Sequence, residues 1–391
     1  MIPFIDLTRQ YKGIEEELLS ASKRVFEKGR FILGEEVSAF EEEFAHYCGV
    51  AYGVGVGSGT DALYLALKAA GVGEGDEVIT VAHTFISTAL AISFTGANPI
   101  FVDVDPYTYT MDPNELDRLL KNRKRKEGRH SKIKAILPVH LYGHPAEMDA
   151  IMDIADHYRL AVIEDACQAH GAVYQGRKVG SFGLLGCFSF YPTKNLGGYG
   201  DGGMVITDHK KLYEKLRFLR CYGEKKKYHH ILKGGNNRLD EIQAAFLRVK
   251  LKYLDIWNEE RRRKALIYKK RLEGLEVVCP IEDRQARHVY HLFAILTKKR
   301  NALQTFLKEK GIETLIHYPI PIHLQKAYKE LGYQKGDLPL TEKCSQGILS
   351  LPFFPEITES EIEEVADQIR CFIDLSALLG RQAGDRQGAQ H

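Results

Sequence analysis

The clearest candidate for chemistry in this sequence is a lysine, Lys194, in the segment Ser189-Phe-Tyr-Pro-Thr-Lys194-Asn-Leu-Gly-Gly. It follows an apolar run over residues 186–190 that predicts a buried strand, and it precedes a glycine-rich turn. Most lysines are solvated surface charges. A lysine held between a buried strand and such a turn is instead a candidate for a depressed pKa and for Schiff-base chemistry with a carbonyl group.

A carboxylate is expected at the end of another strand. The apolar run that begins at Val162 ends in the acid pair Glu164 and Asp165, and ligands of open α/β sheets bind at the carboxyl ends of strands. Beside a Schiff-base lysine, a carboxylate suits pyridoxal phosphate (PLP), because it pairs with the pyridinium nitrogen and keeps the ring an electron sink. The alternatives are an ordinary cap and a metal ligand. No second histidine or acid has ligand spacing nearby, so we expect no metal.

An anion site is predicted at Gly57-Ser-Gly59-Thr60-Asp61, where a strand is followed by a small turn and the start of a helix. Free backbone N–H groups and the positive end of the helix dipole favour a phosphate at such a turn. A plain helix cap is the alternative, since Ser, Thr and Asp all serve as N-caps.

Two nucleotide motifs are excluded. The segment 198–203 matches G-x-G-x-x-G but precedes a strand instead of following one, and the turn at Gly59 lacks the third glycine. This glycine spacing argues against a nicotinamide oxidoreductase, and no G-K-[ST] triplet occurs, which excludes a P-loop.

Anion turn, strand-end acid and lysine follow one another in the order expected of a PLP site, and the chain resembles the DegT/DnrJ/StrS family of sugar aminotransferases. The resemblance extends from Pro3 to about residue 374. Relatives that deoxygenate sugars carry histidine at the lysine position, so a lysine at 194 is typical of the aminotransferases. The matching segments are Ser58–Leu63, Thr84-Phe85, Glu164–Gly171, Ser189–Asn195, Gly200–Gly203 and Gly235–Ala245.

The resemblance implies a role for each matched side chain. Lys194 would form the Schiff base and then move the proton between the cofactor and the substrate carbon. Asp165 would hold the pyridinium, Gln168 would bond the ring hydroxyl, and Phe85 would stack on the ring. Asn236 of a partner subunit would complete the phosphate site, which implies a homodimer with shared active sites. The phosphate would be bound by Gly59, Thr60 and Ser189. His83 and His170 are expected to lie outside the catalytic set.

Within the family, the chain resembles the branch that aminates C3 of a nucleotide-linked 3-keto-6-deoxyhexose, with dTDP as the expected nucleotide. The resemblance implies that Tyr191, His317 and Tyr318 line the hexose and that L-glutamate, leaving as 2-oxoglutarate, is the amino donor. The diphosphate needs a cation, for which the sequence offers three candidates: Arg30, Lys226 and Lys227.

Other functions remain open at this point. A 4-keto nucleotide sugar or a UDP-linked 3-keto sugar acid would need the same cofactor site. A non-catalytic regulatory or sensory protein is the alternative of a different class, but an intact lysine, aspartate and phosphate turn argue against it.

The elements that must position these residues alternate between strands and helices. We expect strands at 51–56, 77–81, 99–104, 134–139, 160–164, 186–190 and 203–207, with helices at 60–70, 84–95, 112–121, 145–158 and 209–221. Two amphipathic helices are expected before them, and a long helical pattern runs from 238 to 272. Beyond it we expect strands at 275–279, 289–296 and 312–317 and helices near 300–310 and 358–373.

This pattern predicts an α/β fold with a large, mostly parallel sheet, and the resemblance makes it an aspartate aminotransferase-like (type I PLP) fold. We expect a large PLP-binding domain over residues 1–250 and a smaller C-terminal α+β domain over 251–375. The polar residues 376–391 are expected to be disordered.

Composition excludes several classes of protein. The chain has 391 residues, 54 Lys and Arg against 52 Asp and Glu, and a net charge of +2, which predicts neither a nucleic-acid nor a membrane partner. The basic run from Lys121 to Lys134 has no interleaved aromatic residues and is expected to be a solvated loop. The seven scattered cysteines and the lack of a signal-like N-terminus indicate a reduced, cytoplasmic protein.

Overall fold

The computed structural model describes residues 1–127 and 132–388, without the side chains of 126–127 and 377–388. Its centre is a seven-stranded sheet with the order β1-β9-β8-β5-β4-β2-β3. The pairs from β8 to β3 are parallel, while β9 runs antiparallel to both β8 and β1. These strands are β1 Tyr52–Val56, β9 Gly203–Thr207, β8 Leu185–Ser189, β5 Ala161–Asp165, β4 Ile133–Ile136, β2 Glu77–Val81 and β3 Asn98–Val102.

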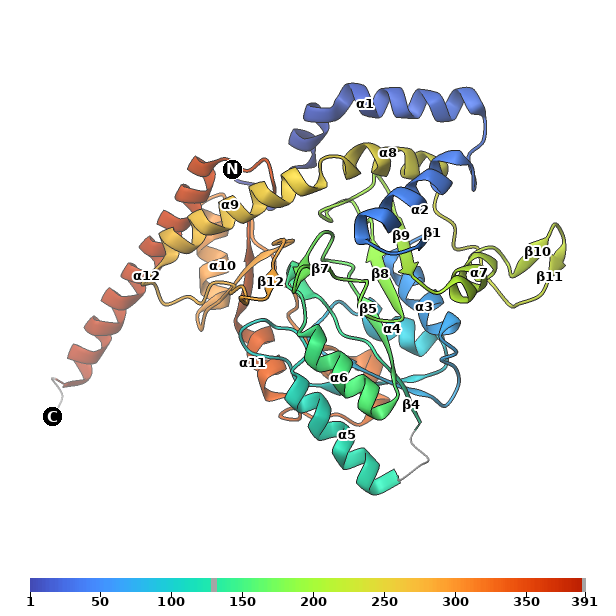
Figure 1. The fold of residues 1–391 in the computed structure, drawn as a ribbon. Helices are drawn as coiled ribbons and strands as arrows, with labels where there is room; N and C mark the ends of the chain where they lie inside the picture. Colours follow the sequence, from blue (N-terminus) through green and yellow to red (C-terminus); the bar gives the residue numbers. More distant parts are fainter. Residues whose placement is uncertain (128–131, 389–391) are drawn as a thin grey trace.

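Helices cover both faces of this sheet (Figure 1). Successive side chains of a strand point to opposite faces, and accordingly Val162 and Ile163 of β5 belong to two different apolar clusters. One cluster packs under α2 Glu35–Cys48, α5 Pro113–Glu127, α6 Met148–Tyr158 and α8 Glu241–Leu251. The other packs under α3 Gly59–Ala69, α4 Ser87–Phe94 and α7 Lys210–Leu219. All seven expected strands and the five helices between them are present.

The C-terminal part differs more from the expectation. The long helical pattern forms two helices, α8 and α9 Leu254–Leu272, and only β13 Phe293–Leu296 of the three expected strands forms. Near 275–279 and 312–317 there are isolated bridges alone, at Val278, Ile312 and Leu315. The partner of β13 is β14 Ile348–Leu351, which begins directly after a helix, α11 Pro339–Gly347.

The remaining elements are short or terminal. Helix α1 Leu7–Lys28 lies along α8, and the β10–β11 hairpin extends from the body of the molecule (Figure 1). The short and terminal elements other than α1 are η1 Leu141–Gly143, β6 Val173–Tyr174, β7 Arg177–Lys178, β10 Glu224–Lys226, β11 His229–His230, β12 Ala286–Arg287, α10 Arg300–Glu309, η2 Ile322–Leu324, η3 Lys326–Leu331 and α12 Glu359–Gly388.

Two stretches expected to lack regular structure are helical. Helix α12 continues to Gly388, through most of the expected disordered tail, because Ala, Arg and Gln favour helix and no proline interrupts the segment. Helix α5 includes Lys121–Glu127 of the basic run, because Lys, Arg and Glu also favour helix and no proline interrupts this segment. Residues 128–131 of that run and 389–391 of the tail lie outside the described residues.

Contacts cross the expected domain boundary at residue 250. Ile2 pairs with Ile312, and Ile322, Tyr328 and Leu338 pack on Phe101 of the large sheet. The Tyr333 hydroxyl accepts a hydrogen bond from the Phe101 N–H of β3, the outermost strand, at 3.0 Å. The two-domain division therefore stays a prediction, while the segment 322–340 covers one edge of the large sheet. No helix in the described parts of the chain is long and apolar enough to cross a bilayer.

Candidate active site

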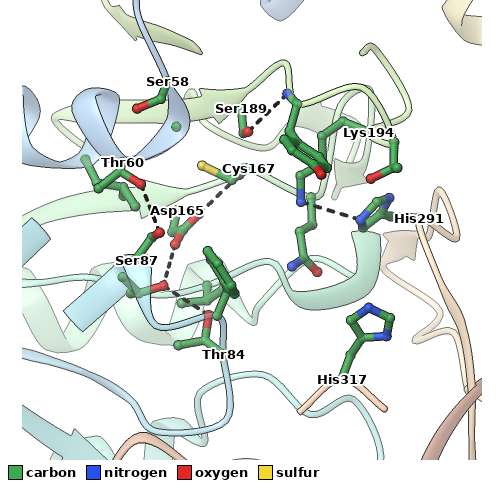
Figure 2. A pocket seen from close by; sticks show the side chains of 18 of the residues that line it. Ser58, Thr60, Thr84, Ser87, Asp165, Cys167, Ser189, Lys194, His291 and His317 are labelled. Atoms are coloured by element: carbon green, nitrogen blue, oxygen red, sulfur yellow. Dashed lines mark hydrogen bonds between the residues drawn. The ribbon is translucent and has the colours of Figure 1, made fainter. Parts of the chain in front are cut away.

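A cavity of about 480 Å³ lies at the carboxyl end of β5 and beside the end of β8. The cavity is lined by the residues that the sequence assigns to the cofactor and the hexose within one subunit: Gly59, Thr60, Phe85, Asp165, Gln168, Ser189, Tyr191, Lys194, His317 and Tyr318. They come from the N-terminus of α3, from the segment before α4, from the ends of β5 and β8 with the turns that follow, and from the segment before η2 (Figure 2). The structure thus brings together side chains that are up to 259 positions apart in the sequence, as Gly59 and Tyr318 are. The three candidates for the diphosphate, Arg30, Lys226 and Lys227, are not among the lining residues of the cavity.

Lys194 is placed by the turn that follows β8. Its backbone N–H donates to the Tyr191 carbonyl at 2.9 Å, and its Nζ lies 3.5 Å from His291 Nε2 (Figure 2). The surrounding protein desolvates the ammonium form and lowers the pKa of Lys194, whereas Cys167 and Asp165 act to raise it. A lowered pKa makes the amine available as a nucleophile and as a base.

Asp165 lies at the end of β5 and is buried. Its Oδ2 accepts a hydrogen bond from Thr88 Oγ1 at 2.8 Å, and its Oδ1 accepts one from the Cys167 N–H at 3.2 Å. Thr84 Oγ1 lies 3.0 Å from Thr88 Oγ1 and extends this network. Two donors orient the carboxylate while it faces the cavity, which suits pairing with a cationic ring nitrogen.

The turn before α3 forms a cradle at the helix N-terminus. Ser58 caps the helix through the Asp61 N–H at 3.0 Å, and Thr60 Oγ1 donates to Ser87 Oγ at 2.9 Å. A Cβ atom at Gly59 would lie 2.6 Å from the Cβ of Ser189, so only glycine lets the turn approach β8 this closely. N–H groups, hydroxyls and the helix dipole converge there, as a phosphate requires.

The opposite wall of the cavity is aromatic and polar. Phe85 is about half exposed to it, and its ring centroid lies 5.8 Å from that of Tyr318. Gln168 Nε2 donates to the Tyr318 hydroxyl at 3.1 Å. His317 Nδ1 lies 2.9 Å from Ser350 Oγ, and burial, with Lys194 nearby, lowers the pKa of His317 to about 4. This imidazole is therefore neutral near pH 7.

One expected residue lies apart from the others. Asn236 is exposed and does not line the cavity of its own chain; it pairs through its backbone with Cys221 beyond α7. The prediction that it enters a partner's site is untested in a single chain.

Sequence reasoning missed four lining side chains that contact the expected ones: Ser87, Thr88, Cys167 and His291. Thr88 follows Thr84 by one helical turn, a spacing that could have signalled it. His291 has no local motif, because it reaches Lys194 across 97 positions. His83 and His170 do not line the cavity, as expected; His170 packs between Phe188 and Phe190, and burial lowers its pKa to about 3.

The polar groups that line the cavity fit the three polar parts of PLP. A phosphate fits the cradle at Gly59, a pyridinium fits the Asp165 carboxylate, and an aldehyde fits the Lys194 amine. Among the described residues, no group of three or more His, Cys, Asp or Glu side chains is arranged to hold a metal ion. This fold and this cavity define a PLP enzyme of the aspartate aminotransferase type (fold type I).

The chain belongs to the DegT/DnrJ/EryC1/StrS aminotransferase family, whose model matches residues 12–370. It is 45% identical over 370 residues to the dTDP-3-amino-3,4,6-trideoxy-alpha-D-glucose transaminase of Streptomyces venezuelae, covering 94% of this chain and 95% of that one. It is 47% identical over 374 residues to a pleiotropic regulatory protein of Geobacillus stearothermophilus, covering 95% and 98%.

A solved structure agrees with the fold. The crystal structure of S. venezuelae DesV in complex with a ketimine intermediate superimposes with a TM-score of 0.91 at 44% identity, covering 95% of this chain and 98% of that one. The protein is thus a PLP-dependent aminotransferase, which confirms the family, fold, enzyme class and cofactor expected from the sequence.

Proposed function

We propose that this aminotransferase moves an amino group from L-glutamate to the C3 keto group of a dTDP-linked 3-keto-6-deoxyhexose. The proposal is supported by the name of the S. venezuelae relative, a transaminase of a dTDP-linked 3-amino sugar. Bound PLP supplies the electron sink that lets the amino group pass between the two substrates. The product is a nucleotide-linked 3-amino sugar.

The observation that carries the sugar assignment is the wall formed by Tyr191, His317 and Tyr318, opposite a lysine that can move a proton. A neutral imidazole can donate or accept a hydrogen bond, and aromatic faces pack against the apolar face of a pyranose. The pKa of His317, lowered to about 4, keeps this ring neutral at the pH of the reaction. Neither group places a fixed charge against an uncharged hexose.

The chain's own residues divide the remaining work. Lys194 Nζ moves a proton between the substrate carbon and the cofactor, a role that its lowered pKa favours. Asp165, oriented by Thr88, balances the positive ring nitrogen. We further propose a homodimer in which Asn236 of the partner subunit completes the phosphate site.

An absorption spectrum followed by single-turnover mixing tests this proposal. The purified protein with PLP should show a visible band that L-glutamate bleaches, and a dTDP-linked 3-keto-6-deoxyhexose should restore it. The variant Lys194→Ala should show neither change, because it has no amine to bond the cofactor or to move the proton.

A panel of dTDP-, UDP- and GDP-linked keto sugars separates the alternatives. A strong preference for a 4-keto sugar or for a UDP-linked 3-keto sugar acid would overturn the substrate assignment and leave the aminotransferase intact. If the band never forms after PLP is added, or if Lys194→Ala retains the biological function, the result favours a non-catalytic regulatory protein over an aminotransferase.

A further inference from the structure

Tyr142 is a buried tyrosine just outside the cavity, in the short helix η1 Leu141–Gly143. Its φ of 57° lies in the left-handed region, which L-residues with large side chains rarely adopt. Such a backbone conformation persists only where the surrounding contacts hold it, and it concentrates at functional sites. In this conformation, both the backbone N–H and the hydroxyl of Tyr142 form hydrogen bonds with residues of the site.

Tyr142 closes a ring of hydrogen bonds with three residues of the site. Its backbone N–H donates to Gln168 Oε1 at 2.8 Å, and Gln168 Nε2 donates to the Tyr318 hydroxyl at 3.1 Å. The Tyr142 hydroxyl donates to the carbonyl oxygen of His317, the residue before Tyr318. One tyrosine therefore joins the side chain expected at the cofactor ring to the pair expected at the sugar.

The direction of the hydroxyl proton follows from the two neighbours of the Tyr142 oxygen, the His317 carbonyl and the His83 ring. His83 Nε2 lies 3.1 Å from the Tyr142 oxygen, and Ser345 Oγ lies 3.4 Å from His83 Nδ1. His83 is buried, which lowers its pKa to about 4, so the ring carries one proton near pH 7. The carbonyl oxygen of His317 can only accept, so the Tyr142 hydroxyl donates to it, and the proton on His83 Nε2 is donated to the tyrosine oxygen.

We propose that Tyr142 is a positioning residue for the sugar substrate: its hydroxyl sets the His317–Tyr318 segment against Gln168, and so fixes the hexose wall relative to the cofactor. The inference rests on the proposed function, since it assigns His317 and Tyr318 to the sugar. The half-reaction with L-glutamate involves no sugar, so it depends less on the positions of His317 and Tyr318. Tyr142 thus acts on one half-reaction more than on the other.

The variant Tyr142→Phe tests this division, because it removes the hydroxyl and keeps both the ring and the amide that bonds Gln168. The PLP absorption band and the rate of bleaching by L-glutamate should stay near wild type. For the keto sugar, KM should rise and kcat/KM should fall by about tenfold, the loss of one buried hydrogen bond. Calorimetric titration of the cofactor-free chain with the nucleotide-linked 3-amino sugar should show Kd raised by a similar factor.

Tyr109→Phe is the matched control. Tyr109 is equally buried, its ring centroid lies 6.0 Å from that of Tyr142, and it bonds neither Gln168 nor His317. This variant should leave both half-reactions unchanged. A second variant, Ser350→Ala, removes the other anchor of His317 without altering Tyr142 and should reproduce the sugar-selective loss.

The outcomes separate this inference from the proposed function. If the wild-type protein accepts glutamate but binds and aminates no keto sugar of the panel, the proposed function fails. If the wild type aminates the sugar and Tyr142→Phe matches it in KM and Kd, the inference is overturned. Equal losses in both half-reactions of Tyr142→Phe and Ser350→Ala overturn it too, because they indicate a general structural role.

Discussion

The pKa of Lys194 is set by opposing influences that can be separated by substitution. Enclosure by protein lowers it, and the charges of Cys167 and Asp165 raise it. The carboxylate of Asp165 therefore has two electrostatic effects: it can balance the charge of a cationic ring, and it stabilises the protonated form of Lys194. Removing the carboxylate charge leaves Cys167 alone to oppose the desolvation of Lys194.

We expect Asp165→Asn to lower the pKa of Lys194 further, because a neutral amide no longer favours the ammonium form. The measurement is the pH dependence of Lys194 acylation by acetic anhydride in the cofactor-free chain, followed by peptide mass spectrometry. Asp201→Asn is the control, since Asp201 also lines the cavity but does not contribute to the Lys194 shift. An unchanged or raised pKa in Asp165→Asn would contradict the assignment.

At the scale of elements, the sequence was most informative where apolar runs and helical patterns alternate. All seven strands of the large sheet could be predicted, because strands covered on both faces are continuous apolar runs bounded by turns. Strands at 275–279 and 312–317 were wrong, since each segment pairs through isolated bridges alone. β14 was missed because its four residues directly follow a helix.

The site was predictable to the extent that its residues lie in motifs. Gly59, Asp165 and Lys194 each occupy a turn or a strand end with a local signature. His291 and Tyr142 carry no such signature, because their contacts with Lys194 and His317 come from packing across 97 and 175 positions. No local pattern encodes a contact of that kind.

The start of α12 contains a capping box joined to an ion pair. Thr358 and Glu361 bond reciprocally through their backbone N–H groups, and Glu361 also takes two hydrogen bonds from Arg9 of α1, at 2.7 and 2.8 Å. The bond to Arg9 is the largest influence that lowers the pKa of Glu361, to about 2 from a value of 4.5. The N-terminal helix is thereby tied to the C-terminal one.

We expect Glu361→Gln to destabilise the fold by about 1 kcal/mol at pH 7, since it removes the charge from a bidentate, partly buried pair. A depressed carboxyl pKa adds stability that is complete above pH 4.5 and is lost as the pH falls through about 2. The difference in thermal midpoint between variant and wild type should therefore shrink below pH 4.5. Glu363→Gln, which removes an exposed partner of Arg271, should change the midpoint less; a pH-independent difference would count against the ion pair.

At the scale of the whole molecule, the exposed position of Asn236 favours a site shared between two copies of the chain. Asn236 lies beyond the β10–β11 hairpin and outside its own cavity. A C2 dimer would carry it to the partner's phosphate cradle and return the partner's Asn236 to this one.

Subunit mixing tests this arrangement. Homodimers of Lys194→Ala and of Asn236→Ala should each be nearly inactive, the second because its phosphate site is incomplete. After the two are mixed and allowed to exchange, hybrid dimers contain one site with both residues intact, so about a quarter of wild-type activity should return. No recovery, with exchange confirmed by native mass spectrometry, would show that Asn236 serves its own subunit.

The covered edge of the large sheet has a consequence for synthesis. Strand β3 is complete once residue 102 has left the ribosome, but Tyr333, whose hydroxyl bonds its outer N–H, comes more than two hundred residues later. Throughout that interval a nascent chain exposes an apolar strand edge, the feature that templates aggregation. The final third of this protein therefore covers a strand edge in the first third. A chain released before residue 333 is made would leave that edge exposed and would depend on a chaperone to avoid aggregation.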